Sequence, residues 1–560
     1  MRHLYELIEI AARWGVAHAF ISPGSRNAPL IIGFAHHTSI TCHPVVDERS
    51  AGYMAMGVAQ QTGKPVALVC TSGTAALNFA PAVAEAYYQH IPLIVLTADR
   101  PPEWIDQQDG QAIHQNRIFG DHVRYADQLP VDCSHPDARW HSNRIVNEAL
   151  CVALGEPGGP VHINIPLREP LYPENGRVPT FPKEVRILEQ TRGLPVFSDA
   201  QKAQIAGELA GFKKILVLVG QMPRRDKLSA KIDRLAQNCG IAFLGDITSN
   251  CHGAKHLVPI NDLTANALTS EDAPELLITM GGGILPKSLK RFLRENGPQA
   301  HWHVSPTEWP DTYKSMTRHL QTGPVDFLCG LESEDSRQPS PYGPSLCAKL
   351  WAHHRRISGT LKGEQPFNEF TATSQVLAAL PKPSVLHLGN SMPVRIAALC
   401  GLEDPVTQVF ANRGTSGIDG VLSTAVGHAM AAPASMHVVL IGDLSFFYDR
   451  NALWQPPPEN LRIVLLNDGG GGIFSIIPGP SDFPGAHALF STPHKRDASL
   501  TAKEHGLDYA AVRTFPELQK ALPAFFAKGE RSRILEVFTE GRHNLSAYAK
   551  LNSIKERGES

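Results

Sequence analysis

The sequence lacks the features by which a secreted or membrane-spanning protein is recognised. No apolar run reaches about 18 residues, the length that a helix needs to cross a bilayer. Glu6 and Glu9 interrupt the segment where a signal peptide would have its apolar core. The nine cysteines are scattered and form no C-x-x-C pair, so a zinc or dithiol site has no support. We expect a cytoplasmic protein without a membrane span, since this cysteine usage fits a reducing compartment.

An excess of charge of one sign is also lacking. The formal net charge is −2 and no basic block occurs, so nucleic acid is not an expected partner. Hydrophobic residues make up 42% of the chain and charged residues 19%, which is ordinary for a globular protein. Its 560 residues are too many for one hydrophobic core. At roughly 150 residues per domain, three or four domains are expected.

Short apolar runs alternate with helix-like segments along the whole chain. Near the start, Leu4, Leu7 and Ile8 recur at the spacing of one helix face, and residues 75–86 form another helix-like run. Continuous apolar strands that alternate with helices indicate parallel sheets covered on both faces. The predicted strands are 18–21, 65–70, 91–97 and 161–166, then 214–220, 241–247, 276–283 and 301–305, and finally 385–389, 406–411, 436–441, 462–466 and 534–538. Polar turns follow several of them, where such sheets bind ligands.

Two stretches separate these three sets of strands. Pro170–Pro182 is rich in proline and reads as a linker, and Glu332–Pro344 is polar and contains serine and proline. The sequence therefore predicts an α/β protein with three doubly wound parallel-sheet domains. We place them at residues 1–175, 183–335 and 360–560.

Glu48 is a candidate for proton chemistry. It follows the β-rich run 41–46, which ends in two valines, and precedes the small residues 50–57 of a predicted helix. A carboxyl group buried in such surroundings has a raised pKa and can share a proton with a ring nitrogen. The alternative is a solvated acid in the first turn of a helix, where the helix dipole favours negative charge.

Asp443 and Asp468 form a candidate metal site. Each follows a predicted strand, and Gly469–Gly472 permits close approach of the backbone. Mg²⁺ prefers hard oxygen ligands and shares them with phosphates, so the two carboxylates and a carbonyl near Gly470 could hold it, while Ser445 could donate to a phosphate. Taken alone, the pattern favours a glycine-rich turn with two capping aspartates.

Eight short motifs together give the chain a resemblance to a known family. They are Ser22-Pro23-Gly24-Ser25-Arg26, Asp47-Glu48-Arg49, Thr71-Ser72-Gly73-Thr74, Leu96-Thr97-Ala98-Asp99-Arg100-Pro101-Pro102-Glu103, Gly389-Asn390-Ser391, Asn412-Arg413-Gly414-Thr415-Ser416-Gly417-Ile418-Asp419-Gly420, Gly442-Asp443-Leu444-Ser445 and Gly471-Gly472-Ile473-Phe474-Ser475. Over essentially its whole length the chain resembles the MenD family, the thiamine-diphosphate-dependent 2-succinyl-5-enolpyruvyl-6-hydroxy-3-cyclohexene-1-carboxylate synthases of menaquinone biosynthesis. The Gly-Asp-Leu-Ser form separates this family from most relatives, which carry Gly-Asp-Gly.

The resemblance implies a fold, a reaction and an assembly. The first domain would bind the aminopyrimidine of thiamine diphosphate, and the third would bind its diphosphate through Mg²⁺ or Mn²⁺. The enzyme would be a transferase that decarboxylates 2-oxoglutarate and adds the succinyl carbanion to isochorismate. It would be a homodimer, or a dimer of dimers, in which two chains share each active site.

The resemblance also implies roles for individual residues. The catalytic residue would be Glu48, which would hydrogen-bond the aminopyrimidine ring. The cofactor-binding residues would be Glu48, Ser391, Ile418, Asp443, Leu444, Ser445 and Ile473, and the metal ligands Asp443, Asp468 and Gly470. The substrate-binding residues would be Ser25, Arg26, Arg100, Gln111, Lys287, Asn390, Arg395, Arg413 and Phe474. Two dicarboxylate substrates require such cations, and arginine binds carboxylates through two hydrogen bonds, although any single arginine could equally form a surface ion pair.

The chain departs from the family pattern at two positions. Asp468 stands where many thiamine-diphosphate enzymes have asparagine, which would make the metal site more anionic. Ser288 follows Lys287 where some members have a second cation, which puts the carboxylate clamp of the central domain in question.

Three other functions compete with this interpretation. A different thiamine-diphosphate lyase, such as an acetohydroxyacid synthase or a 2-oxoacid decarboxylase, would not need the cationic set. A non-catalytic relative would not need to keep Glu48, Asp443 and Asp468. A nicotinamide-binding protein would carry G-x-G-x-x-G after its first strand, and this sequence does not.

Overall fold

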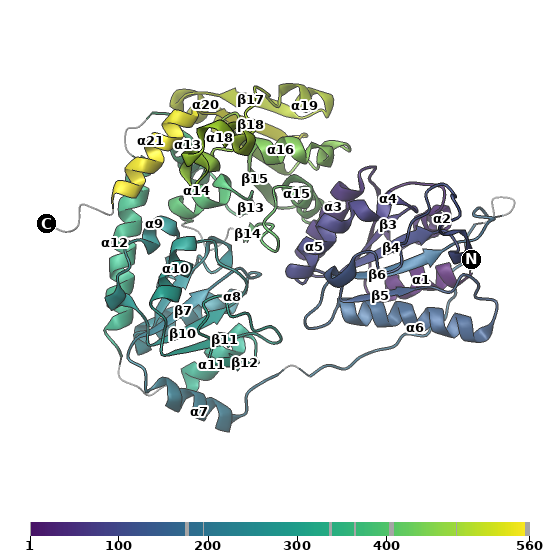
Figure 1. Cartoon of the computed structure of the whole chain (residues 1–560), viewed down its shortest axis with the longest axis horizontal. Coiled ribbons are helices and arrows are strands. Elements are labelled where there is room, and N and C mark those ends of the chain that lie inside the picture. The colour runs from purple at the N-terminus through teal and green to yellow at the C-terminus, as the bar shows by residue number, and fades with distance from the viewer. Residues whose placement is uncertain are drawn as a thin grey trace.

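The computed structural model has three six-stranded sheets that follow one another along the chain (Figure 1). All strand pairs in the described residues are parallel, and helices lie against the sheets, which confirms the predicted fold class. The structure describes residues 2–173, 178–193, 195–334, 339–362, 366–402, 408–477 and 479–554. None of the helices within these ranges is long and apolar enough to cross a bilayer.

The N-terminal unit contains the sheet with strand order β2-β1-β3-β4-β6-β5. Its strands are β1 His18–Ile21, β2 Thr41–Pro44, β3 Val66–Cys70, β4 Leu93–Asp99, β5 Tyr125–Gln128 and β6 Val161–Pro166. Its helices are α1 Arg2–Arg13, α2 Ala28–His36, α3 Glu48–Thr62, α4 Thr74–Asn78, α5 Ala80–Tyr88 and α6 Pro136–Ala153. All residues of β3, β4 and β6 are buried, as expected for central strands that are covered on both faces.

The central unit contains the sheet with strand order β12-β11-β10-β7-β8-β9. Its strands are β7 Ile215–Val219, β8 Ala242–Gly245, β9 Leu257–Pro259, β10 Leu276–Met280, β11 Ala300–Val304 and β12 Arg318–Leu320. Its helices are α7 Asp199–Leu209, α8 Asp226–Cys239, α9 Asp262–Ala265, α10 Lys287–Glu295, α11 Pro324–Glu334 and α12 Tyr342–Lys362.

The C-terminal unit contains the sheet with strand order β14-β13-β15-β16-β18-β17. Its strands are β13 Ser384–Leu388, β14 Gln408–Phe410, β15 Met436–Gly442, β16 Leu461–Asn467, β17 Asp508–Val512 and β18 Arg533–Phe538. Its helices are α13 Glu369–Ala378, α14 Met392–Cys400, α15 Val421–Ala431, α16 Asp443–Tyr448, α17 Ile473–Ile476, α18 Pro484–Ser491, α19 Ser499–Glu504, α20 Phe515–Phe526 and α21 Gly541–Asn552. This order repeats that of the N-terminal sheet, whereas the central sheet has the order 3-2-1-4-5-6 of dinucleotide-binding folds.

The sequence missed four strands, β5, β9, β12 and β17, and all four lie at the edge of a sheet. They are three to five residues long, and most contain polar or half-exposed residues, so they form no continuous apolar run. The predicted helix over 75–86 is also two helices, α4 and α5, separated at Phe79. Pro81 lies in the first turn of α5, where the backbone N–H that proline lacks would have no partner within the helix. In the interior of one continuous helix, the same proline would remove a hydrogen bond and break the helix.

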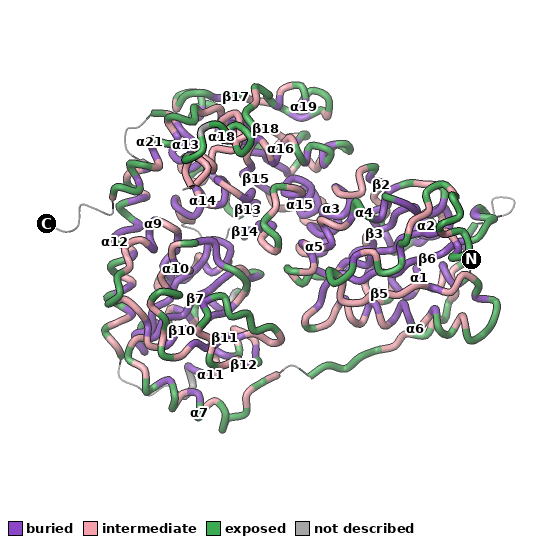
Figure 2. The backbone as a smooth tube through the Cα atoms, in the orientation of Figure 1, coloured by how far each residue is buried: buried purple, intermediate pink, exposed green. Residues whose placement is uncertain are grey.

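The predicted linker, Pro170–Pro182, has neither helix nor strand in its described residues (174–177 lie outside them), but it runs along the N-terminal unit, where Phe181 packs on the core. The extended connection to the central unit follows it in the chain and leads into α7 (Figure 1). Figure 2 shows this connection largely exposed, in contrast to the buried strands of the three sheets. The second predicted boundary falls between α11 and α12, and its residues 335–338 are outside the described part of the chain. The three domain ranges remain predictions, and each sheet lies within one of them.

Helices α3 and α15 join the N-terminal unit to the C-terminal unit (Figure 1). The two backbones meet at glycine on both sides. A Cβ atom on Gly57 would lie 2.2 Å from the carbonyl oxygen of Thr424, and one on Gly427 would lie 2.1 Å from that of Met54. Both distances are shorter than any contact that a real Cβ atom makes, so only glycine at these two positions lets α3 and α15 approach this closely.

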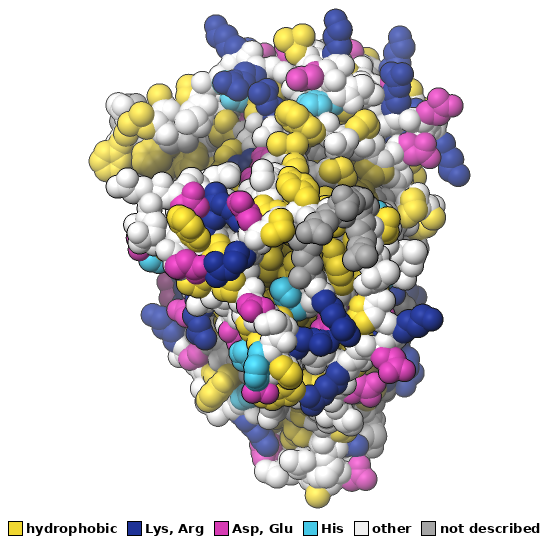
Figure 3. Space-filling model, turned by 90° about the vertical axis from the view of Figure 1, so that its right-hand side faces the viewer, with side chains coloured by type: hydrophobic (Ala, Val, Ile, Leu, Met, Phe, Trp, Pro, Cys, Tyr) yellow, Lys and Arg dark blue, Asp and Glu magenta, His cyan; other side chains and the backbone are white. Residues whose placement is uncertain are grey.

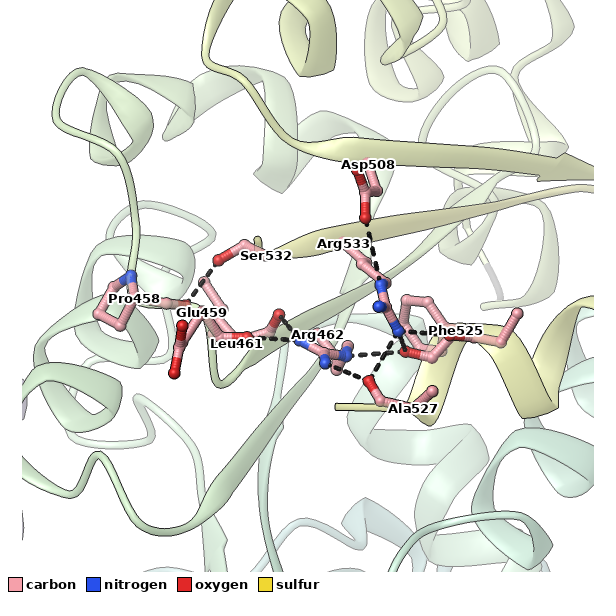
Figure 4. A network of polar contacts seen from close by, with 10 residues as sticks. Pro458, Glu459, Leu461, Arg462, Asp508, Phe525, Ala527, Ser532 and Arg533 are labelled. Carbon is pink, nitrogen blue, oxygen red and sulfur yellow. Dashed lines mark hydrogen bonds and ion pairs between the residues drawn. The ribbon is translucent and has the colours of Figure 1, made fainter. Parts of the chain in front are cut away.

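Two arginines hold the C-terminal end of α20 (Figure 4). Arg462 is fully buried on β16, and it donates to the carbonyl oxygens of Phe525 at 2.7 Å and Ala527 at 2.6 Å. Arg533 on β18 donates to the same two oxygens at 3.2 and 2.7 Å. The last carbonyls of a helix have no partner within it and carry partial negative charge. The two guanidinium groups therefore supply both hydrogen bonds and charge at this helix end.

We predict that Arg462→Leu destabilises the protein by roughly 2–4 kcal/mol, because it leaves buried carbonyl groups with fewer donors. Arg462→Lys should lose less, since one cationic donor remains. Arg531→Leu is the control, because Arg531 is an exposed cation two residues from Arg533. Thermal unfolding of the three variants measures the effect. Equal midpoints for Arg462→Leu and the control would contradict the role given to this network.

Candidate functional site

The candidate site lies at the carboxyl edge of the C-terminal sheet. The strand order reverses between β13 and β15, and ligands of open α/β sheets bind outside the carboxyl ends of strands at such a switch point. Asn390 and Ser391 follow β13, Asp443 follows β15, and Asp468 follows the neighbouring strand β16. The structure thus brings together motifs that are up to 78 residues apart in the sequence, since 468 − 390 = 78.

Asp443 is buried, and both of its carboxylate oxygens accept hydrogen bonds from the backbone. Oδ1 accepts from the N–H of Leu444 at 2.6 Å, and Oδ2 accepts from those of Gly469 and Gly470 at 3.0 and 2.9 Å. Nε2 of His494 lies 3.2 Å from Oδ2 but is not aligned for a hydrogen bond. Burial raises the pKa of Asp443 to about 6, although the backbone hydrogen bonds lower it. The carboxylate is therefore oriented, and its negative charge is poorly compensated.

Asp468 and Glu369 add two more carboxyl groups. Burial and the charge of Asp443 raise the pKa of Asp468 to about 6. Glu369 begins α13 and is 5% exposed, and burial raises its pKa further, with the charges of Asp468 and Asp443 adding to the effect. Sequence reasoning missed Glu369, because it lies 99 residues before Asp468 (468 − 369 = 99) in a helix without a motif.

A cavity of about 180 Å³ opens beside these carboxyl groups. It is lined by Glu369, Asp468, the loop Gly469–Gly472 and Asn544 of α21, among others. Among the described residues, no three side chains of His, Cys, Asp or Glu are placed to hold a metal ion together. A cation at this edge would therefore need oxygen ligands besides the carboxylates.

Ser445 is engaged in a hydrogen bond within the chain, and Ile418 is partly exposed. The hydroxyl of Ser445 donates to the carbonyl oxygen of Ile418 at 2.5 Å, so donation to a phosphate would require this bond to be exchanged. The Ile418 side chain is 39% exposed, as expected for an apolar surface that packs under a ligand rather than in a core. Ile473 packs against the C-terminal core, and the ring of Phe474 lies 5.7 Å from that of Phe490.

Glu48 begins α3, and its position is fixed by its neighbours. Asp47 caps the helix, accepting from the N–H groups of Arg49 and Ser50 at 2.9 and 3.4 Å. Glu48 itself is half-buried, and burial raises its pKa while a backbone hydrogen bond lowers it. The expectation of a buried acid holds only in part, because Val45 is buried whereas Val46 is 52% exposed.

The first residues of α3 also contact the C-terminal unit. Arg49 donates to the carbonyl oxygen of Tyr448 at 2.8 Å, and its guanidinium lies 4.3 Å from the centre of the Tyr448 ring. Asn451 donates to Asp47 at 2.8 Å. These contacts hold the Glu48 segment against the end of α16 and the residues that follow it.

The turn after β13, Asn390 and Ser391, contacts both arginines predicted for the C-terminal unit. The side-chain oxygen of Asn390 accepts from Arg413 at 3.0 Å, and its amide nitrogen donates to the carbonyl oxygens of Asn412 and Gly417, both at 2.7 Å. Arg395 on α14 donates to the carbonyl oxygen of Ser391 at 2.7 Å. Both guanidiniums are half-buried, and among the described residues neither forms an ion pair. Burial lowers the pKa of both.

The arginines predicted to bind substrate in the N-terminal unit, unlike Arg395 and Arg413, lie within ion-pair distance of carboxylates. Arg26 is buried, donates to the carbonyl oxygen of Leu167 at 3.0 Å and lies 3.5 Å from Glu169. Arg100 donates to the carbonyl oxygen of Gly110 at 2.7 Å and pairs with Asp109 at 3.0 Å. Ser25 and Gln111 are exposed nearby, and Lys287 is exposed at the start of α10. The structure therefore forms two groups of predicted substrate residues, one on each outer unit, and places Lys287 apart from both on the central unit.

The comparisons with known proteins agree with this geometry. Residues 4–120 match the family model "Thiamine pyrophosphate enzyme, N-terminal TPP binding domain", and residues 183–388 match "Middle domain of thiamine pyrophosphate". The 2-succinyl-5-enolpyruvyl-6-hydroxy-3-cyclohexene-1-carboxylate synthase of Cytophaga hutchinsonii is 42% identical over 98% of both chains, and the enzyme of that name from Bacteroides thetaiotaomicron is 38% identical over 96% of both. Benzoylformate decarboxylase from Polynucleobacter necessarius has a similar fold, with a TM-score of 0.71 at 16% identity over 97% of this chain and 99% of that one.

Proposed function

Because the chain belongs to the family of thiamine-diphosphate-dependent 2-succinyl-5-enolpyruvyl-6-hydroxy-3-cyclohexene-1-carboxylate synthases, we propose that its substrates are 2-oxoglutarate and isochorismate. The reaction would release the 1-carboxyl group of 2-oxoglutarate as carbon dioxide. The remaining four-carbon unit would form a carbon–carbon bond to the ring alkene of isochorismate.

The observation that carries this proposal is the pair of half-buried arginines without an acid. Arg395 and Arg413 both contact the turn after β13, through Ser391 and Asn390, and form no ion pair among the described residues. A buried or half-buried charge without a partner is costly, so such a pair fits a ligand that brings its own carboxylates. 2-Oxoglutarate keeps a second carboxylate after decarboxylation, whereas pyruvate and benzoylformate do not. The arginines thus favour this family's substrates over those of other thiamine-diphosphate lyases.

The carboxylates at the sheet edge fit a divalent cation. Burial raises the pKa values of Asp443 and Asp468, and beside Asp443 lies the imidazole of His494, at 3.2 Å, rather than a lysine or an arginine. We propose Mg²⁺ or Mn²⁺ there, held by Asp443, Asp468 and the carbonyl oxygen of Gly470, with diphosphate oxygens as further ligands. Ser391, Leu444, Ser445 and Ile473 would contact the cofactor beside it.

When bound, thiamine diphosphate supplies the carbanion chemistry. This chain's residues would position the reactants and move protons. Glu48 would hold a proton at a nitrogen of the aminopyrimidine ring, for which the raised pKa of a half-buried carboxyl group is suitable. Ile418 would support the cofactor, and Phe474 would contact substrate. Ser25, Arg26, Arg100, Gln111 and Lys287 would bind isochorismate, and Asn390 would keep Arg413 in place.

We propose a homodimer in which each site combines residues of two chains. Glu48 is on the N-terminal unit and Asp443 on the C-terminal unit, and both must reach one cofactor. The single chain leaves Val46, Ile418 and Tyr448 exposed near these residues, at 52%, 39% and 52%. An apolar surface of this kind fits a second copy of the chain.

The direct test of function is an incubation with isochorismate, 2-oxoglutarate, thiamine diphosphate and Mg²⁺, with the product identified by mass. Replacing 2-oxoglutarate by pyruvate is the control. Product with pyruvate and none with 2-oxoglutarate would assign the chain to another lyase activity.

We predict that Glu48→Gln lowers turnover by roughly 100-fold or more and leaves cofactor binding largely intact, because glutamine hydrogen-bonds but cannot share a proton with the ring. Glu184→Gln is the control, since Glu184 is exposed. Initial rates and a titration with thiamine diphosphate measure the two effects. Turnover near that of the wild type would exclude the role given to Glu48.

Asp443→Ala should weaken Mg²⁺-dependent binding of thiamine diphosphate by more than roughly 100-fold, because it removes a proposed metal ligand. Loss of a residue that only hydrogen-bonds to a metal ligand typically costs about 10- to 100-fold in metal affinity, so loss of the ligand itself should cost more. Asp468→Asn should be tolerated, because asparagine keeps an oxygen and removes only the charge. Titration of each variant with thiamine diphosphate at several Mg²⁺ concentrations compares them. Equally severe losses would contradict the assignment. Thermal unfolding shows whether the alanine variant has kept its fold, since Gly469 and Gly470 lose their acceptor.

A further inference from the structure

Helix α10 carries a cation that no motif identifies. Lys287 and Arg291 on this helix are exposed, whereas Lys290 is half-buried. The fully buried Leu289 and Leu293 fix how the helix packs on the central unit. Within the described residues Lys290 forms no ion pair and donates no side-chain hydrogen bond. A lysine that only solubilised the helix would extend into water, as its two neighbours do.

Hydrogen bonds place the start of α10 next to α14, which carries Arg395. Ser288 donates to the carbonyl oxygen of Asp262 at 2.8 Å, which ties α10 to α9. Asn261, the cap of α9, donates to the carbonyl oxygen of Ala398 at 3.3 Å on α14. Arg395 lies three residues before Ala398, on the same face of that helix. Figure 1 shows α9 and α10 on the side of the central unit that faces α14.

A second set of bonds places α10 near Arg413. Asn250 and Val409 exchange two hydrogen bonds, at 2.9 and 2.7 Å, and so join the loop after β8 to strand β14, four residues before Arg413. Asp246 at the start of the same loop accepts from the N–H of Leu285 at 2.6 Å, just before α10. The loop after β8 therefore contacts both the segment before α10 and the strand before Arg413.

The charges around Lys290 are consistent with this placement. Burial lowers the pKa of Lys290, and the charge of Arg413 lowers it further, whereas Asp246 and Asp262 raise it. The two aspartates are already engaged. Asp246 also accepts from Thr248 at 2.7 and 2.9 Å, and Asp262 accepts from the N–H of Ser288 at 3.0 Å. Lys290 thus lies close to Arg413, and Arg413 close to Arg395, while the carboxylates of Asp246 and Asp262, which face these cations, form no ion pair with them among the described residues.

We infer that Lys290 completes a clamp with Arg395 and Arg413 that positions the second carboxylate of 2-oxoglutarate. This inference rests on the proposed function. Lys290 thereby supplies from α10 the second cation that Ser288, with its hydroxyl committed to Asp262, does not provide. Arginine binds a carboxylate in a fixed planar geometry, and the flexible lysine adds a point charge to it.

The test compares three variants of the holoenzyme. Lys290→Met keeps the length of the side chain and removes its charge, Lys290→Arg keeps the charge, and Arg291→Met removes an exposed cation from the same helix. Lys290→Met should raise KM for 2-oxoglutarate by roughly 10- to 100-fold, the usual loss for one hydrogen bond to a charged group. Lys290→Met should leave kcat and the KM for isochorismate within about twofold of the wild-type values. Lys290→Arg should have a KM for 2-oxoglutarate close to that of the wild type. Arg291→Met should resemble the wild type in all three constants.

Binding of glutarate, an unreactive dicarboxylate, gives a readout that is independent of turnover. Calorimetry should show weaker binding for Lys290→Met than for Arg291→Met. Equal KM values and equal glutarate affinities in these two variants would overturn the inference, even if the wild type makes the expected product. If the wild type uses pyruvate but not 2-oxoglutarate, the proposed function fails, and the glutarate comparison still decides whether the clamp exists. A loss that Lys290→Arg does not restore would also overturn it.

Discussion

The contact between α3 and α15 is the constraint on which the functional site depends. The two helices approach so closely that a side chain on Gly57 or Gly427 would collide with the opposite backbone. Their contact holds the N-terminal sheet against the C-terminal sheet. Residues of the N-terminal unit then reach the loop that follows β14: Glu85 accepts from the N–H groups of Gly414 and Thr415 at 2.8 and 2.6 Å, next to Arg413. The loop that carries Arg413, one of the proposed substrate-binding residues, is therefore held by another unit of the chain.

Unpaired charge of both signs surrounds the carboxyl edge of the C-terminal sheet. Asp443, Asp468 and Glu369 lie around the glycine loop, and Arg395, Arg413 and Lys290 lie where the central unit meets α14 and β14. Opposite charges that met directly would neutralise one another and leave nothing for a ligand. The carboxyl groups suit a metal ion with its diphosphate, and the cations suit a dicarboxylate. Elsewhere charges of both signs are mixed, as the face in Figure 3 shows.

The sequence predicted most of the central strands, because a strand buried on both faces is a continuous apolar run. It missed the edge strands β5, β9, β12 and β17, whose residues are partly exposed or polar. It did not reveal that the central sheet differs in strand order from the other two, since strand order depends on contacts between distant segments. Motifs at strand ends located Asp443, Asp468, Asn390 and Arg413. Glu369 and Lys290 lie on ordinary helices, so only the fold shows that Glu369 lines the cavity and that Lys290 lies near Arg413.

The central proposal is that the Glu48 and the Asp443 of one active site come from two different chains of a homodimer, although α3 and α15 of one chain already pack together. Mixing Glu48→Gln chains with Asp443→Ala chains under conditions that exchange subunits tests it most directly. In a mixed dimer with shared sites, one site carries both substitutions and the other carries neither. The account predicts that activity reappears, up to about one wild-type site per mixed dimer. If exchange is demonstrated and activity stays at the level of the separate variants, each site is built within one chain and the account is wrong.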